Sequence, residues 1–158
     1  MEKVYIGVGS NLGERAGFLD RARWLVSKLP QSRFLRSSSI YETEPVGGPP
    51  QGKYLNAVWE IETALDPGKF KDSLRSIEAN LGRRYPSLAN APREIDLDIL
   101  FYGDRVLHEK ELIIPHPRLH ERMFVLEPLA ELAPHLFHPV LKKTVKELLE
   151  KVVEAGKK

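Results

Sequence analysis

The chain has 158 residues, of which 42% are hydrophobic and 29% charged, a balance typical of a globular protein in water. Its 24 basic and 22 acidic side chains leave a net charge of +2 and are mixed along the sequence, which argues against a nucleic-acid partner. Cysteine is absent, which excludes disulfides and thiol catalysis, and no apolar run approaches the roughly 20 residues that cross a bilayer. We therefore expect one cytoplasmic domain over residues 1–158, without a secretory signal or a membrane partner.

The chain begins with a predicted strand followed by a predicted helix. The strand covers Lys3–Val8, which is rich in β-branched and aromatic residues. Apolar residues from Phe18 to Leu29 then recur at helical spacing, and Pro30 ends the run. The glycines between these two elements lack the spacing of a dinucleotide-binding turn, so we interpret the segment as a tight turn.

Two more strands and a second helix are predicted next. The strands cover Ser32–Tyr41 and Tyr54–Thr63, and in the latter apolar and polar residues alternate. Between them, Glu44–Lys53 contains three prolines and three glycines, which indicates a loop: either a functional flap or a plain connection. Asp66 is a predicted cap for the second helix, with a proline in its first turn, and Gly82 is its predicted end.

The stretch Pro92–Leu100 carries the strongest chemical signal. Apolar residues alternate there with Glu94, Asp96 and Asp98, a pattern typical of a strand with one apolar and one acidic face. Residues two apart on a strand lie roughly 7 Å apart and point the same way, so Asp96 and Asp98 present paired carboxylates. Mg²⁺ takes oxygen ligands of this kind together with substrate phosphates. The alternative is a half-buried strand whose outer face is acidic and binds nothing.

The last third of the chain predicts a hairpin and short helices. Gly103–Asp104 indicates a turn after which Arg105–Leu107 pairs back on the preceding strand. We expect one helical turn at Pro117–Arg122, a short helix at Pro128–Leu132, and a final helix opened by the Thr144–Glu147 capping box. The element order predicts an α+β, ferredoxin-like fold: a mainly antiparallel sheet with helices packed on it, and an extra C-terminal hairpin and helices.

The five histidines do not predict a zinc site. His116 and His120 have a spacing that can bind zinc on a helix, but no third ligand lies close in sequence. We expect His108, His120, His135 and His138 at the surface.

Taken together, these motifs resemble the 6-hydroxymethyl-7,8-dihydropterin pyrophosphokinase family. The resemblance runs from YIGVGSNLG at Tyr5–Gly13 to about Ala133, and its most specific part joins Pro92–Leu100 to IPHPRLHERMFVLEPL at Ile114–Leu129. It implies transfer of a pyrophosphoryl group from ATP to a pterin hydroxymethyl oxygen, with release of AMP, in folate biosynthesis. Further motifs fall in the expected order: YETEP at Tyr41–Pro45, YLN at Tyr54–Asn56 and IE…GR at Ile77–Arg83.

The resemblance also implies roles for individual residues, in a protein that we expect to act as a monomer on small-molecule substrates. Asp96 and Asp98 would hold two Mg²⁺ ions, and Arg83, from a closing loop, and Arg93 would join them as catalytic residues. For the pterin, Tyr54 and Phe124 would stack on the ring, and its polar edge would meet Asn56 and the segment containing Thr43, Pro45 and Val46. For ATP, the implied contacts are Glu78, Arg93, Ile99, His116 and Arg122.

Other roles stay open on the residues alone. Tyr54 and Phe124 also suit a core, and Glu78 by itself suggests an exposed acid on a helix. Glu111 is a departure, since some relatives carry Arg there, and Asn90–Ala91 replaces a frequent Trp-Gly. Two competing functions are a ferredoxin-like binding module, which need not respond to Mg²⁺, and a Mg²⁺-dependent phosphohydrolase, which would ignore the pterin.

Overall fold

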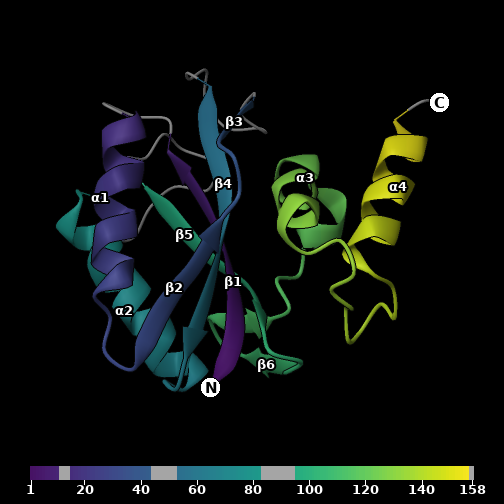
Figure 1. The fold of residues 1–158 in the computed structure, drawn as a ribbon. Helices are drawn as coiled ribbons and strands as arrows, with labels where there is room; N and C mark the ends of the chain where they lie inside the picture. Colours follow the sequence, from purple (N-terminus) through teal and green to yellow (C-terminus); the bar gives the residue numbers. More distant parts are fainter. Residues whose placement is uncertain (11–14, 44–52, 83–94, 157–158) are drawn as a thin grey trace.

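The computed structural model describes residues 1–10, 15–43, 53–82 and 95–156. A five-stranded sheet forms its centre, in the order β2-β4-β1-β5 with β3 also paired to β4, and every one of these pairs is antiparallel. Helices cover both faces of this sheet (Figure 1). The predicted α+β fold with an antiparallel sheet is confirmed. The elements of this part are β1 (Glu2–Ser10), α1 (Arg15–Ser27), β2 (Ser32–Ser37), β3 (Tyr41–Thr43), β4 (Tyr54–Thr63), α2 (Pro67–Asn80) and β5 (Asp96–Tyr102).

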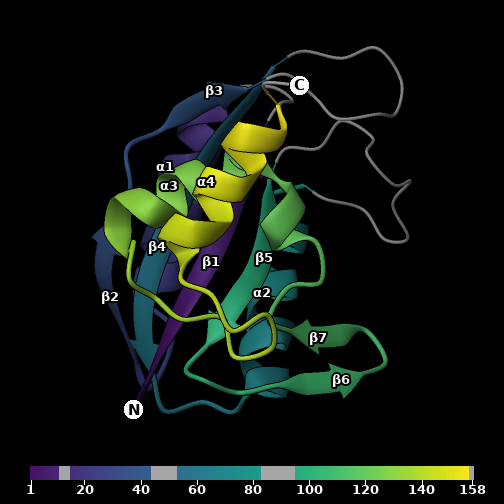
Figure 2. The ribbon, with the colours of Figure 1, turned by 90° about the vertical axis from the view of Figure 1, so that its right-hand side faces the viewer.

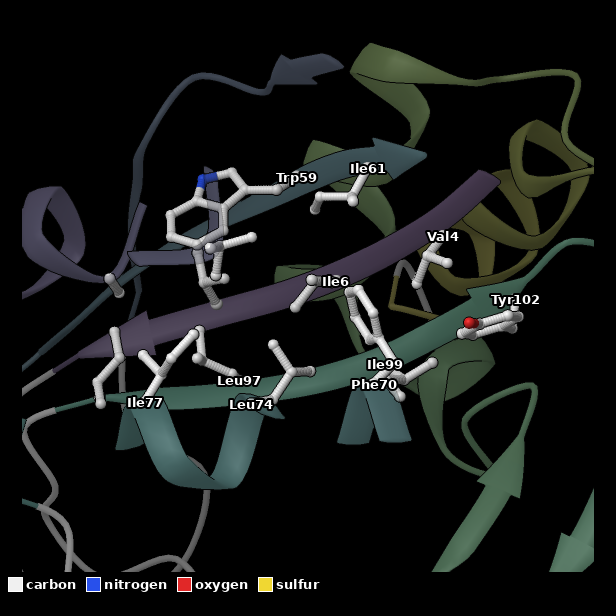
Figure 3. Packing of buried hydrophobic residues seen from close by; sticks show 14 of the residues in the cluster. Val4, Ile6, Trp59, Ile61, Phe70, Leu74, Ile77, Leu97, Ile99 and Tyr102 are labelled. Atoms are coloured by element: carbon white, nitrogen blue, oxygen red, sulfur yellow. The ribbon is translucent and has the colours of Figure 1, made fainter. Parts of the chain in front are cut away.

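The sheet separates two hydrophobic cores. On one face α1 and α2 pack on alternate residues of the strands, such as Ile6 and Trp59 (Figure 3). On the other face, β1 and β4 contribute Tyr5 and Val58 to a second core, which lies under the C-terminal helices. Because both faces are covered, the central strands are buried along almost their whole length.

The local signals for α2 operate as the sequence predicted. The Asp66 side chain accepts a hydrogen bond from the Lys69 N–H at 3.0 Å, and Pro67 occupies the first turn. Phe70 and Leu74 are buried in the first core. Gly82 follows the helix with a φ of 108°, a left-handed conformation that favours glycine.

Strand Ser32–Tyr41 was predicted as one element but is two. The Ser38 hydroxyl accepts the Val58 N–H at 2.8 Å, and the Ser38 N–H donates to the Val58 carbonyl at 2.9 Å. Here a side chain takes the place of a backbone acceptor, so the ladder between β2 and β4 is interrupted. The chain then pairs with β4 again through the three residues of β3.

The predicted hairpin partner of β5 is wrong. The turn at Gly103 is present, with the Arg105 N–H donating to the Tyr102 carbonyl at 3.1 Å, but the chain does not pair back on β5. One edge of β5 bonds β1, and on the other the Leu100 carbonyl accepts the His116 N–H at 3.0 Å. The hairpin forms instead between β6 (Leu107–Glu109) and β7 (Leu112–Ile114), apart from the main sheet (Figure 2).

The C-terminal part holds a 3-10 turn, η1 (Leu119–Glu121), and two helices, α3 (Met123–Leu132) and α4 (Val145–Ala155). The predicted turn and the Thr144–Glu147 capping box are confirmed. Helix α3 begins five residues before the predicted start, because burial of its apolar side chains outweighs the hydrogen bond that Pro128 cannot make. In the described ranges, no helix combines the length and apolarity that crossing a membrane requires.

His138 was expected at the surface, and this expectation is wrong. Its side chain is buried, and its Nδ1 accepts the N–H groups of Val140 and Leu141 at 3.2 and 3.0 Å. The ring also packs edge-on against Phe101, with 5.5 Å between the centroids. The imidazole therefore closes the turn before α4 from inside the second core, which explains its burial.

Candidate active site

Strand β5 presents the two aspartates side by side on one face. Leu97 and Ile99 point into the first core, so Asp96 and Asp98 lie on the opposite face, where both are half-buried. Two carboxylates at this spacing suit a hard cation that takes its other ligands from water and phosphate. In the ranges that the structure describes, no three His, Asp or Glu side chains come close enough together to hold a metal ion, and this includes the region of the two aspartates.

Glycines stand directly across from both aspartates. In the register of β1 and β5, Gly9 pairs with Asp96 and Gly7 pairs with Asp98. Gly7 lies inside β1 as the sequence predicted, whereas the interpretation that placed Gly9 in the following turn is wrong, since β1 continues to Ser10. Paired residues of antiparallel strands share a face, so β1 contributes no side chain to the space beside the carboxylates.

The same register connects the aspartates to Asn56. Gly9 pairs with Asp96 on one side and with Asn56 on the other, so three residues of β5, β1 and β4 form one row on one face. With strands spaced 4.7–4.9 Å apart, the ends of this row are roughly 10 Å apart. A Cβ at Gly9 would lie 3.0 Å from Asn56 Oδ1 and 3.4 Å from the Tyr54 ring, so only glycine fits without a shift.

Asn56 belongs to a polar group at the end of β4. Its side chain is buried, and its amide nitrogen donates to the Thr43 hydroxyl. Thr43 pairs with Tyr54 in the register of β3 and β4, so the structure brings these three predicted residues together. Tyr54 is half-buried, so part of this residue stays accessible.

A cavity of about 290 Å³ opens between α2, β5 and the segment after the β6–β7 turn. It contains Asp98 and three of the residues predicted to contact nucleotide: Glu78, Ile99 and His116. The remaining lining residues are Lys71, Leu74, Arg75, Leu97, Glu111, Leu112, Ile113 and Pro117.

Glu78 is 3% exposed, so the interpretation as an exposed helix acid is wrong. One of its oxygens accepts the Leu97 N–H at 2.7 Å. Leu97 lies between Asp96 and Asp98, at an edge of the sheet where its amide needs an acceptor from outside the ladder. The carboxylate therefore fixes the last turn of α2 to the segment of β5 that carries the aspartates.

His116 is neutral at physiological pH. Burial and the charge of Arg122 lower its pKa to about 4, while the charge of Asp96 opposes this shift. Its Nδ1 accepts the Arg118 N–H at 3.2 Å, so the proton of the neutral ring is on Nε2. The ring thus offers one N–H donor within the electrostatic reach of Asp96 and Arg122.

Arg122 immediately precedes α3 and lies near both His116 and Phe124. The Arg122 guanidinium lies over the Phe124 ring, 5.6 Å from its centroid, and Phe124 is half-buried in the first turn of the helix. The structure thus places both predicted residues at the start of one helix.

The sequence patterns did not point to two basic residues in the cavity, Lys71 and Arg75. Arg75 is on α2, and its guanidinium forms an ion pair at 3.6 Å with Glu111 of the β6–β7 turn, which also lines the cavity. Burial and the charge of Arg75 lower the pKa of Lys71, against the attraction of Glu111, Asp98 and Asp72. Residues 71, 75 and 78 are four and three apart, so the sequence alone could have placed Lys71 and Arg75 on the same helix face as Glu78. Four predicted residues lie outside the described ranges: Pro45, Val46, Arg83 and Arg93.

Comparisons with known proteins identify the family of this chain. The profile of the family described as 7,8-dihydro-6-hydroxymethylpterin-pyrophosphokinase (HPPK) matches residues 5–134. The chain is 42% identical over 129 residues to the 2-amino-4-hydroxy-6-hydroxymethyldihydropteridine pyrophosphokinase of Bacillus subtilis, covering 82% of this chain and 77% of that protein. It is 37% identical over 148 residues to the enzyme of the same name from Aquifex aeolicus, covering 93% and 90%.

Two longer proteins also contain a matching region. The folic acid synthesis protein fol1 of Pneumocystis carinii is 40% identical over 153 residues, which cover 97% of this chain and 20% of that protein, so the chain spans about a fifth of its length. A crystal structure of wild-type Plasmodium falciparum HPPK-DHPS with pteroate superposes with a TM-score of 0.78 at 16% identity, over 97% of this chain and 42% of that one. That last likeness concerns the fold alone. By the family profile and the bacterial relatives, the chain belongs to the 7,8-dihydro-6-hydroxymethylpterin-pyrophosphokinase family.

Proposed function

We propose that the chain transfers the pyrophosphoryl group of ATP to the hydroxymethyl oxygen of 6-hydroxymethyl-7,8-dihydropterin and releases AMP, as a step of folate biosynthesis. The family and the names of the bacterial relatives support this reaction. The structural observation that supports it is the row of Asn56, Gly9 and Asp96, which puts an amide and a carboxylate on one face, where we propose that they meet the pterin and the metal. Gly9 leaves the space between them free of a side chain from β1.

ATP would occupy the cavity beside β5. His116 would donate its Nε2–H to the nucleotide, and Arg122 would pair with phosphate oxygens, for which a guanidinium is well suited. Ile99 supplies an apolar wall, and Glu78 holds the backbone of β5 in place. Lys71 and Arg75 add positive charge on the α2 side of the cavity.

Asp96 and Asp98 would hold the Mg²⁺, and we propose two ions, as the family resemblance implies. When bound, Mg²⁺ neutralises phosphate charge and aligns the attacking and leaving oxygens. The protein contributes a rigid carboxylate pair, because the Glu78 bond to Leu97 and the ladder with β1 fix both sides of the strand. Arg83 and Arg93 are proposed to complete the positive charge around the phosphates.

The pterin would bind at the other end of the row. Asn56 offers an amide that matches the donor and acceptor edge of the ring, and Thr43 orients that amide through its hydroxyl. Tyr54 and Phe124 would stack on the flat ring faces, an arrangement favoured between aromatic surfaces. Pro45 and Val46 are proposed to contribute backbone contacts to the polar edge.

Chromatography of the nucleotide products tests the reaction against the two competing functions. With ATP, Mg²⁺ and the hydroxymethyl pterin, AMP and a pyrophosphorylated pterin should form in equal amounts. Omitting the pterin should stop AMP formation, whereas a phosphohydrolase would continue. A binding module would leave the ATP intact in both reactions, and ADP as the sole nucleotide product would exclude pyrophosphoryl transfer.

Three broader predictions accompany this function: residues 1–158 act as one domain, as a monomer, and in the cytoplasm. Support for one domain comes from the two cores, which share a single sheet. Light scattering of the purified chain tests the monomer, and a single calorimetric transition tests the single domain.

A further inference from the structure

Glu131, near the end of α3, gathers three hydrogen bonds from one short segment of the chain. The Ser39 N–H and hydroxyl donate to its Oε2 at 2.8 and 3.1 Å, and the Tyr41 hydroxyl donates to its Oε1 at 2.8 Å. One carboxylate thus accepts hydrogen bonds from Ser39, two residues before β3, and from Tyr41, the first residue of β3. We call this set the Glu131 contacts.

The charge states of the partners favour these contacts over a wide pH range. Burial raises the pKa of Glu131, but the bonds from Tyr41 and Ser39 outweigh burial, and the net pKa is lowered. The bond to Glu131, followed by burial, raises the pKa of Tyr41 to about 12. At neutral pH the carboxylate is therefore charged and the phenol is a donor.

Helix α3 does not depend on Glu131 for its position on the sheet. At the neighbouring residue, the Leu132 carbonyl accepts a hydrogen bond from Arg36 at 3.0 Å, and Arg36 is itself paired with buried Glu60. Leu126 and Leu129 of α3 are fully buried in the second core. Removal of the Glu131 carboxylate should thus leave α3 packed on the sheet. The main effect should be a less firmly held segment from Ser39 to Thr43.

That segment forms one wall of the proposed pterin site. β3 has three residues, and its ladder in the described chain is with β4 alone. Tyr41 stands beside Asn56 in this ladder, and Thr43 at its end accepts the bond from the Asn56 amide. So short a strand has few bonds of its own, and the contacts of Tyr41 and Ser39 with Glu131 supplement them.

Phe124, which is proposed to stack on the pterin, is on the same helix as Glu131. Arg122 and Phe124 lie at the start of α3, and Glu131 lies near its end. We propose that Glu131 is a positioning residue for the pterin, because it ties β3, with Thr43 and the ladder to Asn56, to the helix that carries Phe124. This inference rests on the proposed pterin site.

The test compares Glu131→Ala with Glu127→Gln and Asn56→Ala, measuring pterin and ATP affinities by calorimetry and the melting temperature of each variant. Glu131→Ala should weaken pterin binding about three- to tenfold, the range for loss of a hydrogen-bonded support, while ATP affinity stays within about twofold. Glu127→Gln is the control for charge alone, because this exposed acid, one turn earlier on α3, acts on Tyr41 through its charge but accepts none of the three hydrogen bonds. It should change neither affinity.

A double-mutant comparison separates positioning from a general loss of structure. Tyr41→Phe removes one of the three bonds and should weaken pterin binding less than Glu131→Ala does. In the Glu131→Ala background the same change should add almost nothing, because the partner is already gone. Independent, additive effects would contradict the proposal, and so would equal losses of pterin and ATP affinity or a lower melting temperature with unchanged pterin affinity.

Asn56→Ala distinguishes this inference from the proposed site. If Asn56→Ala leaves pterin affinity unchanged, the proposed pterin site is wrong and the role of Glu131 falls with it. If Asn56→Ala weakens pterin binding but Glu131→Ala does not, the site stands and the positioning role alone is refuted.

Discussion

The two faces of the sheet are built differently. The face under α1 and α2 is mainly an apolar core of aliphatic and aromatic side chains, with the Glu78 carboxylate of α2 buried beside β5. The face under α3 and α4 also buries Asn56, Glu60 and His138, and each of them is hydrogen-bonded. In the described part of the chain, no buried side-chain polar atom lacks a partner. The first face stabilises the fold mainly through apolar burial, whereas the second combines apolar burial with several fixed polar groups that can orient a substrate.

The largest expected effect tests whether the second face carries the chemistry. Asp96→Asn or Asp98→Asn should lower kcat at least about 10³-fold, because a neutral amide is a poor ligand for Mg²⁺. Both side chains are half-buried outside the apolar core, so the melting temperature should change little. Steady-state kinetics and thermal melts of the same samples measure both effects.

Asp72→Asn is the matched control, since Asp72 is an exposed acid on α2. It should retain nearly full activity. Near-normal Mg²⁺-dependent turnover of either β5 variant would show that the aspartates are only the outer face of a strand.

The next largest effect is expected for a substitution in the first core, and it should lower the stability of the protein and leave its catalysis unchanged. Phe70 is fully buried and packs edge-on against Tyr102, with 5.9 Å between centroids. Phe70→Ala should lower the free energy of unfolding by about 3–5 kcal/mol, by lost burial and a cavity. Denaturant unfolding gives this value, and kcat per folded molecule should stay close to that of the parent. A large loss of kcat in fully folded protein would mean that the two faces are not as separable as their composition indicates.

The smallest effect concerns how the stability of the protein depends on pH through His116, the neutral histidine near Asp96. The pKa of His116 in the folded chain is about 4, below its ordinary value of 6.5, so the unfolded state binds the proton first as pH falls. Its contribution to stability is complete above about pH 6.5 and is lost as pH falls toward about 4. Between pH 7 and pH 5 the loss should amount to at most about 2 kcal/mol.

His116→Gln should remove this part of the pH dependence, and denaturant unfolding at both pH values measures it. The exposed His108→Gln serves as the control and should keep the parent's pH profile. Identical profiles for the parent and His116→Gln would mean that the ring is not shielded from protons in the folded chain.

Local signals predicted the elements well, and non-local contacts account for the errors. The Asp66 cap and the Thr144–Glu147 capping box depend on residues a turn apart, so the sequence contains them completely. The partner of β5 and the burial of Glu78 depend on which distant segments meet, and no local pattern encodes that. The alternation around Asp96 predicted the correct face.

The candidate site was predictable to a similar extent. Family motifs led to Asn56, His116 and the aspartates, which the structure places in a row and around a cavity. The motifs did not reveal that Gly9 joins the two ends of that row, because its meaning depends on the register of three strands. The roles assigned to residues outside the described ranges stay predictions.

The bond between Glu78 and the Leu97 amide also has a consequence for hydrogen exchange. That amide is at the outer edge of β5, where a strand would ordinarily exchange its proton with solvent quickly, yet here it donates to a buried carboxylate. Exchange then requires α2 and β5 to separate, which opens the first core beneath them. The exchange rate at the Leu97 amide therefore measures how often α2 separates from the part of β5 that carries Asp96 and Asp98, and it can be measured without substrate.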